Sequence, residues 1–373
     1  MSVRVLVCCF EIPTQGGAAT SAYALFAKMK REGVDAHYVN IVERATVPYF
    51  QWTHGASFGN PAGLPDVHTC IVEWPFSGSQ PALRATIARV APQVVVARGY
   101  IATLFAKQAA PELPVVFSTA GSRQAEFLIA QGRAAQAVDL PALLPRTGRL
   151  PTPAPGNEGA AFDAADVIVP NSDWVGDTIR AFFSVDRSCK VHAEAVWSAE
   201  WVVEAVAASG VRSEPFERRA IDVLFCATSW GRGEKNLPAL QRLVPRLTGL
   251  RVVIVGDCPQ RIAGAEHRGY VDDRTAMFAL LADTKVVAAV SLVDACPTTL
   301  FEAAFLGCNI VATKNCGNWR VCHETLLVDP PDETAFATTI RRGVERQQPN
   351  GLDWFLRTRS YARLLEILAA LAE

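Results

Sequence analysis

The sequence lacks a long hydrophobic run. No stretch approaches the roughly 18 apolar residues that a membrane-spanning helix requires. The first residues, MSVR, lead straight into an apolar segment rather than into a signal peptide. We therefore expect a cytoplasmic protein that has at most peripheral contact with a membrane.

The sequence also lacks an excess of charge of either sign. Lysine and arginine number 36 against 37 acidic residues, which gives a net charge of −1. A protein whose main partner is nucleic acid normally carries a basic surplus, so this balance argues against that class. Half of the 373 residues are apolar, and the chain is long enough for two globular domains, each with its own core.

Paired cysteine motifs are absent. The ten cysteines include no Cys-x-x-Cys pair, and without an export signal we expect reduced thiols. Four cysteines lie near His323 in the sequence: Cys296, Cys308, Cys316 and Cys322. Their spacing fits no common zinc pattern, so we expect no metal site.

The glycine fingerprint of dinucleotide-binding proteins is missing as well. Residues 3–9 predict a strand, residues 18–31 an amphipathic helix and residues 36–42 a second, parallel strand. The turn before the helix contains Gly16 and Gly17 but no third glycine, which argues against an NAD-dependent oxidoreductase. The glycine pair is either a plain tight turn or a loop that approaches a ligand.

The rest of the chain alternates predicted strands and helices. Strands are expected at residues 69–73, 94–97, 115–118, 167–170, 191–196, 222–227, 251–256, 285–293, 309–313 and 326–328. Residues 208–220 have the composition of a linker, and residues 352–373 predict a helix. The proline-rich residues 140–156 predict irregular structure, either a functional loop or an excursion without a role.

The stretch of residues 293–312 carries the clearest functional signal. A predicted strand ends at Val293, and Pro297 suits the first turn of the helix that follows. Thr298 or Thr299 can cap this helix. The free N–H groups at such a helix start attract anions.

Two acids frame this helix start. Asp294 follows the strand and Glu302 lies about one turn into the helix, so both can reach the edge where parallel strands end. Carboxylates accept hydrogen bonds from sugar hydroxyls, while free amides donate to phosphate oxygens. The combination suits a nucleotide-sugar, whereas the alternative is a pair of solvated surface acids.

A glycine-rich turn follows the first predicted strand of the second half. It carries Arg232 and Lys235 before a helix that starts at Leu237. Cations offset the charge of a diphosphate, and glycine lets the backbone approach it. The turn is either part of the same ligand site or an ordinary surface turn.

Together these motifs resemble the donor site of retaining GT-B glycosyltransferases of family 4. The shared features are two acids separated by seven residues, the apolar segment Ala-Ala-Phe-Leu-Gly-Cys-Asn-Ile-Val, and the Gly-Arg-Gly-Glu-Lys turn. The Ala-Asp-Val-Ile-Val-Pro-Asn-Ser segment at residues 165–172 also matches. The sequence departs from the family pattern where Asp294 replaces a glutamate, where Ala120 occupies the slot of a frequent histidine, and in the short arginine-to-lysine spacing.

The resemblance implies an α/β GT-B fold, in which two Rossmann-like domains with parallel sheets face each other across a cleft. An acceptor-side domain would span residues 1–207, the linker residues 208–220, and a nucleotide-sugar-binding domain residues 221–350. Residues 351–373 would form a helix that crosses back to the first domain, and residues 140–156 would cover the acceptor.

The implied activity is retaining transfer of a hexose-type sugar, as in polysaccharide biosynthesis. The donor would be a nucleoside-diphosphate sugar, the acceptor a glycan, a lipid-linked glycan or a small molecule, and no metal or other cofactor would be needed. The alternatives are a nucleotide-sugar epimerase, which would need an acid–base set that the sequence does not offer, and a non-catalytic nucleotide-sugar binder.

The resemblance also implies a role for each site residue. Lys235 and Arg232 would hold the diphosphate, Asp294 a hydroxyl of the transferred sugar, and Glu302 the ribose hydroxyls. Further donor contacts would come from Pro297, Thr298, Thr299, Tyr270, Gly16 and Gly17.

Overall fold

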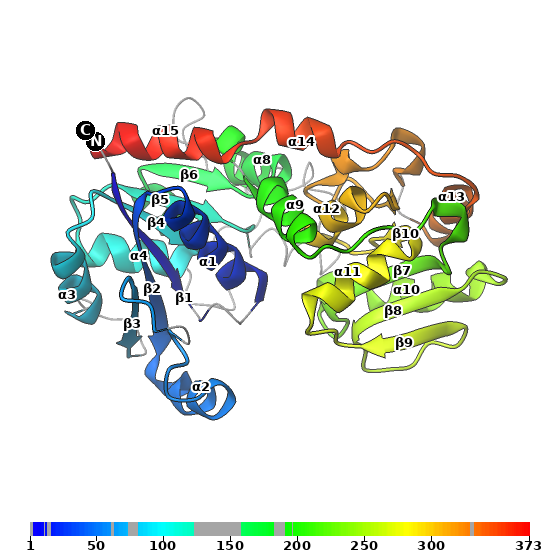
Figure 1. Ribbon diagram of the computed structural model, residues 1–373, viewed down its shortest axis with the longest axis horizontal. Coiled ribbons are helices and arrows are strands. Elements are labelled where there is room, and N and C mark those ends of the chain that lie inside the picture. Colours follow the sequence, from blue (N-terminus) through cyan, green and yellow to red (C-terminus); the bar gives the residue numbers. More distant parts are fainter. Residues whose placement is uncertain are drawn as a thin grey trace.

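The computed structural model describes residues 3–10, 12, 16–60, 63–73, 81–122, 158–182, 191–195, 197–328 and 332–373. They form two parallel β-sheets of six and five strands, each covered by helices (Figure 1). The expected α/β architecture of two Rossmann-like domains is therefore confirmed. The proline-rich residues 140–156, predicted to cover an acceptor, lie outside the described residues.

The first sheet belongs to the N-terminal half. Its strands are β1 (Arg4–Phe10), β2 (Asp35–Glu43), β3 (Val67–Val72), β4 (Val94–Arg98), β5 (Val115–Thr119) and β6 (Val167–Pro170). They lie in the order β3-β2-β1-β4-β5-β6, so successive strands are added on one side of β1 and then on the other. In a parallel sheet, the crevice at such a reversal, outside the carboxyl ends of the strands, is the usual place for a ligand. Here the reversal lies between β1 and β4.

Helices cover both faces of this sheet. On one face, α1 (Gly16–Arg31) and the C-terminal α15 (Tyr361–Ala372) pack on side chains of β1 and β4, and the predicted apolar stripe of α1 is buried there. On the other face lie α3 (Pro81–Val90) and α4 (Tyr100–Ala109). The remaining helices of this half are η1 (Arg44–Thr46), α2 (Val47–His54), α7 (Glu158–Ala164), α8 (Asp173–Phe182) and η3 (Ala193–Ala195).

The second sheet repeats this plan. Its strands are β7 (Ile221–Ser229), β8 (Val252–Asp257), β9 (Ala265–Gly269), β10 (Thr284–Ala288) and β11 (Asn309–Val311), in the order β11-β10-β7-β8-β9. The reversal here lies between β7 and β10, so the loops that follow these two strands meet at one edge.

The helices of the second half also form two layers. On one face lie α9 (Ser198–Ala208), α11 (Arg274–Ala282), α12 (Thr298–Phe305) and α14 (Leu352–Thr358); on the other lie α10 (Leu237–Leu243) and α13 (Glu333–Glu345). Short 3-10 turns complete this half: η4 (Phe216–Arg218), η5 (Gly233–Lys235), η6 (Val244–Leu247), η7 (Trp319–Val321) and η8 (Glu324–Leu326).

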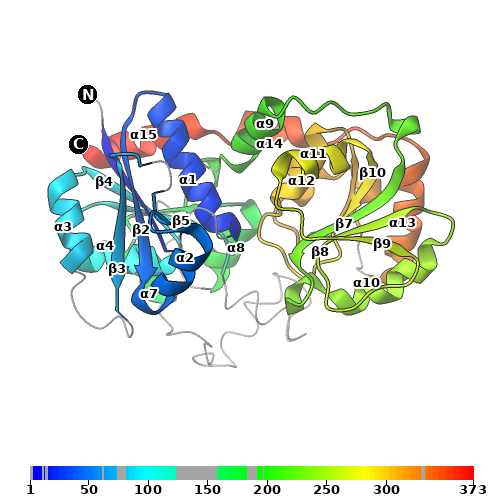
Figure 2. The ribbon, with the colours of Figure 1, turned by 60° about the horizontal axis from the view of Figure 1, so that its bottom comes forward.

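Two elements connect the halves. Helix α9 buries Val202 and Val206 in the core of the second sheet, although Glu204 on the same helix accepts a 2.6 Å bond from Lys28 of α1. Helices α14 and α15 run from the second sheet back to the first, and the two views show α9 between the sheets (Figure 1, Figure 2). Leu368 of α15 is buried in the core of the first sheet.

Several predicted elements differ from the structure. The strand expected at residues 285–293 ends at Ala288, so Val293 lies in the loop between β10 and α12. Within residues 191–195 there is no strand but one bridge between Ile168 and Val191, followed by η3. Likewise, residues 326–328 contribute a single bridge, between Ala312 and Leu327. The C-terminal helical region is divided in two, because Ser360 adopts an extended conformation and caps α15. Within the described ranges, no helix has the length and apolar character needed to cross a membrane.

Candidate functional site

Lys235 and Asp294 form an ion pair at the reversal point of the second sheet. Lys235 Nζ donates to Asp294 Oδ2, and their side chains are 14% and 18% exposed. Asp294 is held by its backbone: its N–H donates to Asn315 O at 3.0 Å, and its carbonyl accepts from Gly317 N at 2.8 Å. The structure thus brings together two predicted site residues that lie on separate loops.

The loop after β7 is locked onto the loop after β10. Asn236 adopts a left-handed conformation (φ 60°) and caps α10 by accepting from Ala239 N. Its Nδ2 donates to Val290 O at 3.1 Å, and Leu292 N donates to Glu234 O at 2.9 Å. Because of these bonds, the position of Lys235 depends on the same loop that carries Asp294.

Helix α12 begins at Thr298, and Pro297 is its N-cap residue. The prediction that a threonine side chain caps this helix is wrong, because no side-chain cap bond forms. The Thr299 side chain instead lies near the Cys226 thiol and opposes the rise in the pKa of that thiol caused by burial. The first-turn amides of Thr298 and Thr299 lack acceptors within the helix, as at any helix start.

Glu302 is buried one turn into α12. Its Oε1 accepts from Arg274 Nη2 at 3.2 Å, and the Arg274 guanidinium carbon lies 5.1 Å from the centres of the Trp201 and Phe278 rings. Burial raises the pKa of Glu302, and the nearby Arg274 opposes this shift. Glu302 and Lys235 both act on the pKa of Cys226, so the two charges face a common region.

The other predicted site residues lie farther from this ion pair. Arg232 pairs with Glu234, and its side chain is 56% exposed. Tyr270 is exposed in the turn after β9. Gly16 and Gly17 form the first residues of α1, which starts two residues earlier than predicted.

The position expected to hold a histidine also has a defined place. Ala120 follows β5, and its carbonyl accepts from Asn171 Nδ2 at 3.1 Å. This backbone contact ties the ends of β5 and β6 together, and the alanine itself offers no acid or base.

The first domain also contacts the Asp294 loop. Ser172 Oγ donates to Ala295 O at 2.7 Å, and Val293 and Ala295 are buried in one apolar cluster with Phe117 and Trp174 of the first half. In the sequence, Ser172 stands out only as the end of the segment at residues 165–172 that matches the family pattern. Such a contact between distant segments has no local signal.

Of the cysteines near this site, Cys308 and Cys316 are buried and Cys226 is partly buried. Burial raises the pKa of Cys226, Cys308 and Cys316 to about 12 in each case. Among the described residues, no group of three or more potential ligands could hold a metal ion.

The two parallel-sheet domains, with a C-terminal helix that returns to the first, define the GT-B class of fold. The chain is similar to the lipopolysaccharide outer core galactosyltransferase WaaB, with 11% identity, a TM-score of 0.63 and coverage of 98% of this chain and 99% of that one. Similarity to HepE from Anabaena in complex with UDP and glucose is comparable, with 14% identity, a TM-score of 0.59 and coverage of 98% and 99%. At such identities the likeness shows the fold alone.

Two further solved structures match over the whole length. Sucrose-phosphate synthase from Thermosynechococcus elongatus is 14% identical, with a TM-score of 0.62 and coverage of 99% of this chain and 98% of that one. UDP-N-acetylglucosamine 2-epimerase from Rickettsia bellii is 11% identical, with a TM-score of 0.60 and coverage of 100% and 97%.

The family comparison is more specific. Residues 221–346 match the family described as glycosyl transferases group 1. This segment includes Lys235, Asp294 and Glu302 of the site. No curated protein matches the chain.

Proposed function

We propose that the protein is a retaining glycosyltransferase that moves a hexose-type sugar from a nucleoside-diphosphate sugar to an acceptor. The observation that supports this most is the Lys235–Asp294 pair, which joins two loops at the reversal point of the second sheet. The group 1 family match over the same segment supports the reaction class. The reduced cysteines favour a cytoplasmic setting.

In this proposal the donor lies against the loops after β7 and β10. Lys235 exchanges part of its contact with Asp294 for the donor diphosphate, Arg232 contributes from the surface, and the amides of Thr298 and Thr299 add hydrogen bonds. Asp294 then accepts from a hydroxyl of the transferred sugar. Pro297 and Tyr270 complete the donor side, while Gly16 and Gly17 approach it from the first domain.

Glu302 is assigned to the ribose. Its carboxylate already accepts from Arg274 at 3.2 Å and retains further acceptor capacity for hydroxyl groups. As the nucleoside diphosphate leaves, negative charge grows on its oxygens. Fixed cations and amides stabilise that charge without reorganisation. A single such hydrogen-bond donor lowers the activation free energy by about 3–4 kcal/mol. No metal or other cofactor is part of the proposal.

Nucleotide binding followed by product analysis tests this function. We expect one of UDP, GDP, ADP, dTDP or CMP to raise the melting temperature of the intact protein, and its sugar conjugate to be consumed when an acceptor is present. Binding without sugar transfer or donor hydrolysis would favour a non-catalytic binder. A change in the configuration of the donor sugar without transfer would favour an epimerase.

A further inference from the structure

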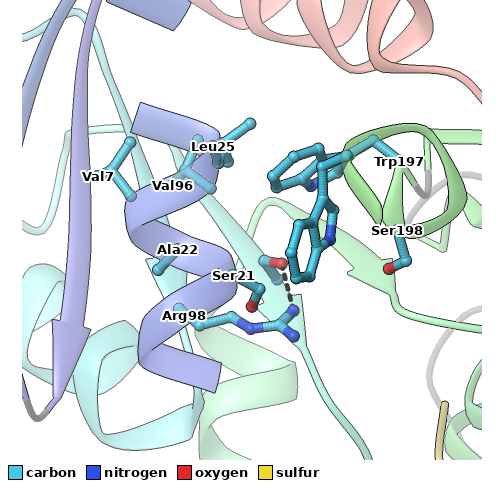
Figure 3. Close-up of a pocket in the computed structure, with 10 residues that line it drawn as sticks. Val7, Ser21, Ala22, Leu25, Val96, Arg98, Trp197 and Ser198 are labelled. Carbon is cyan, nitrogen blue, oxygen red and sulfur yellow. Dashed lines mark hydrogen bonds between the residues drawn. The ribbon is translucent and has the colours of Figure 1, made fainter. Parts of the chain in front are cut away.

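A small cavity lies at the carboxyl edge of the first sheet, on the side covered by α1 (Figure 3). About 20 Å³ of it can be occupied by the centre of a water molecule, which is room for one small group and not for a sugar ring. Val7, Ala22 and Leu25 line one side, and Trp197 and Ser198 the other (Figure 3). The polar and aromatic groups around it are Ser21, Arg98, Ser118, Trp197, Ser198 and Trp201.

Arg98 is the only charged group in this lining. It ends β4, beside β1, and therefore lies at the reversal point of the first sheet. Its Nη1 donates to Ser118 Oγ at 2.8 Å, while Nε is enclosed without a hydrogen-bond partner. Among the described residues, no carboxylate pairs with it.

An enclosed cation without a counter-charge is costly. Burial lowers the pKa of the Arg98 guanidinium, which is the direction expected of a cation removed from water. Leaving such a charge uncompensated destabilises a fold by several kcal/mol, whereas an apolar side chain of similar size would not. A bound anion would supply the counter-charge that this site lacks.

The cavity adjoins the loop that carries Asp294. Ser198 in its lining, Arg98 and Asp294 all lie close enough to the Cys296 thiol to influence its pKa. Trp201 stands between the cavity and the Arg274–Glu302 pair. A molecule anchored at Arg98 thus projects from the first domain toward the place assigned to the transferred sugar.

We propose that Arg98, with the hydroxyls of Ser118 and Ser198, binds an anionic group of the acceptor, a carboxylate or a phosphate whose oxygens enter the cavity. This inference rests on the proposed glycosyltransferase function and adds the chemical class of the acceptor. The guanidinium fork suits two oxygens of one group, and Nε supplies the donor that now lacks a partner.

The test uses the full chain saturated with the nucleoside diphosphate that binds it, so that the donor phosphate site is occupied. Inorganic phosphate and acetate are then titrated in a thermal-shift assay of wild type, Arg98→Met and Arg84→Met. Arg84 is an exposed arginine that donates to Gln108 O at 3.4 Å, and its variant is the matched control. We expect an anion-dependent shift in wild type and in Arg84→Met, and affinity weakened roughly tenfold or more in Arg98→Met.

Stability provides a second readout that separates binding from a structural role. Because Arg98 is a partly buried charge without a carboxylate partner among the described residues, Arg98→Met should melt no lower than wild type in the absence of anions. A marked loss of stability would mean that Arg98 serves the fold and would overturn the inference. If that variant does not fold, Arg98→Lys decides, since it keeps the charge but not the planar fork and should bind anions more weakly than wild type.

Acceptor kinetics complete the test. Hexoses are compared with their 6-phosphates and with hexuronic acids; only the charged acceptors should show a higher KM in Arg98→Met, with kcat little changed. Nucleotide binding without any anion effect would overturn this inference alone. If anions shifted the melting temperature of the nucleotide-free protein but not of the nucleotide-saturated protein, Arg98 would be assigned to the donor site instead. Anion binding without nucleotide binding would overturn the acceptor role together with the proposed function.

Discussion

Lys235 and Asp294 neutralise each other where each is less than one-fifth exposed. Removing one partner leaves the other charge without compensation, so their effects on function are coupled. The chain offers a matched pair elsewhere in the same domain, because Lys285 bonds Asp222 at 2.8 Å and the two side chains are 19% and 20% exposed.

We predict that Lys235→Ala lowers kcat by on the order of 10²–10³, as the loss of a donor to the leaving group does, and changes donor affinity much less. The measurement is turnover of the identified donor together with calorimetric binding of its nucleoside diphosphate. Lys285→Ala should lose comparable stability but keep its turnover. An active Lys235→Ala variant would remove this lysine from the mechanism.

The buried Glu302 makes a prediction about pH. Its pKa is raised above the ordinary value of 4.5, so the folded protein holds this proton more tightly than the unfolded chain does. The contribution of Glu302 to stability therefore falls as pH rises from about 4.5 through the raised pKa. Relative to wild type, Glu302→Gln should gain unfolding free energy over that window, as measured by urea denaturation at several pH values.

Glu333 supplies the opposite control. Its bond from Arg242 holds the pKa of this partly exposed carboxyl below the usual value of 4.5. Glu333→Gln should therefore lose stability relative to wild type as pH rises from that lowered pKa to about 4.5, a window below that of Glu302. Equal pH profiles for Glu302→Gln and wild type would contradict the direction of the shift. Separately, Glu302→Ala should weaken nucleoside diphosphate binding tenfold or more, roughly one or two charge-assisted hydrogen bonds.

At this scale the sequence identified charged residues that follow strands, and it missed those whose role depends on distant contacts. Lys235 and Asp294 were found because each lies in a turn just after an apolar strand. Arg98 also follows such a strand, and that was an available signal. Arg274 carried none, because its place over two aromatic rings and beside Glu302 is created by packing.

The loop between β10 and α12 depends on a close backbone approach at Gly317. A Cβ atom there would lie 1.7 Å from Ala295 O and 2.4 Å from Ser172 Oγ. We predict that Gly317→Ala destabilises the protein by at least about 2 kcal/mol and displaces Asp294, because Gly317 N donates to the Asp294 carbonyl. Unfolding midpoints and donor turnover measure the two effects.

Gly233 is the matched control, since a Cβ there meets no atom within 4 Å. Gly233→Ala lies in the Lys235 turn and should leave stability nearly unchanged. If the two variants were equally stable, the tight approach at Gly317 would not constrain the loop.

Element prediction succeeded where burial and periodicity agreed. Strands β4 and β5 each begin with an unbroken apolar run and were placed within one residue. Strands that are buried on both faces show such runs in place of a polar–apolar alternation. Residues 191–196 are also rich in apolar positions, but of the described residues 191–195 only Val191 bridges β6. Pairing is decided by the neighbouring strand, which propensity does not report.

On the scale of the whole molecule, α15 joins the chain's end to its beginning. Leu368 is 1% exposed among residues of β1, α1 and α15. We predict that Leu368→Ala lowers the unfolding free energy by about 2–5 kcal/mol, as measured by denaturant titration. Arg363→Ala, on an exposed position of the same helix, should have little effect, and equal losses would argue against α15 as part of the first core.

The division into two domains followed from length and from two successive sets of strands. The sequence placed α9 with the first domain, within residues 1–207, yet its apolar side packs on α12 while Glu204 bonds α1. A helix that packs against two cores has an ordinary amphipathic sequence pattern, so only the three-dimensional structure shows which domains it contacts.

The burial of Val293 and Ala295 against the first domain affects how precisely the two domains are positioned relative to each other. Residues of both halves pack against the segment next to Asp294, so a rotation of one domain relative to the other would pivot close to that segment. In the proposed function, this pivot lies beside the transferred sugar. The distance between donor and acceptor would then depend on the packing at this pivot. Looser packing at the pivot would disturb the alignment of donor and acceptor before it lowered the affinity for either of them.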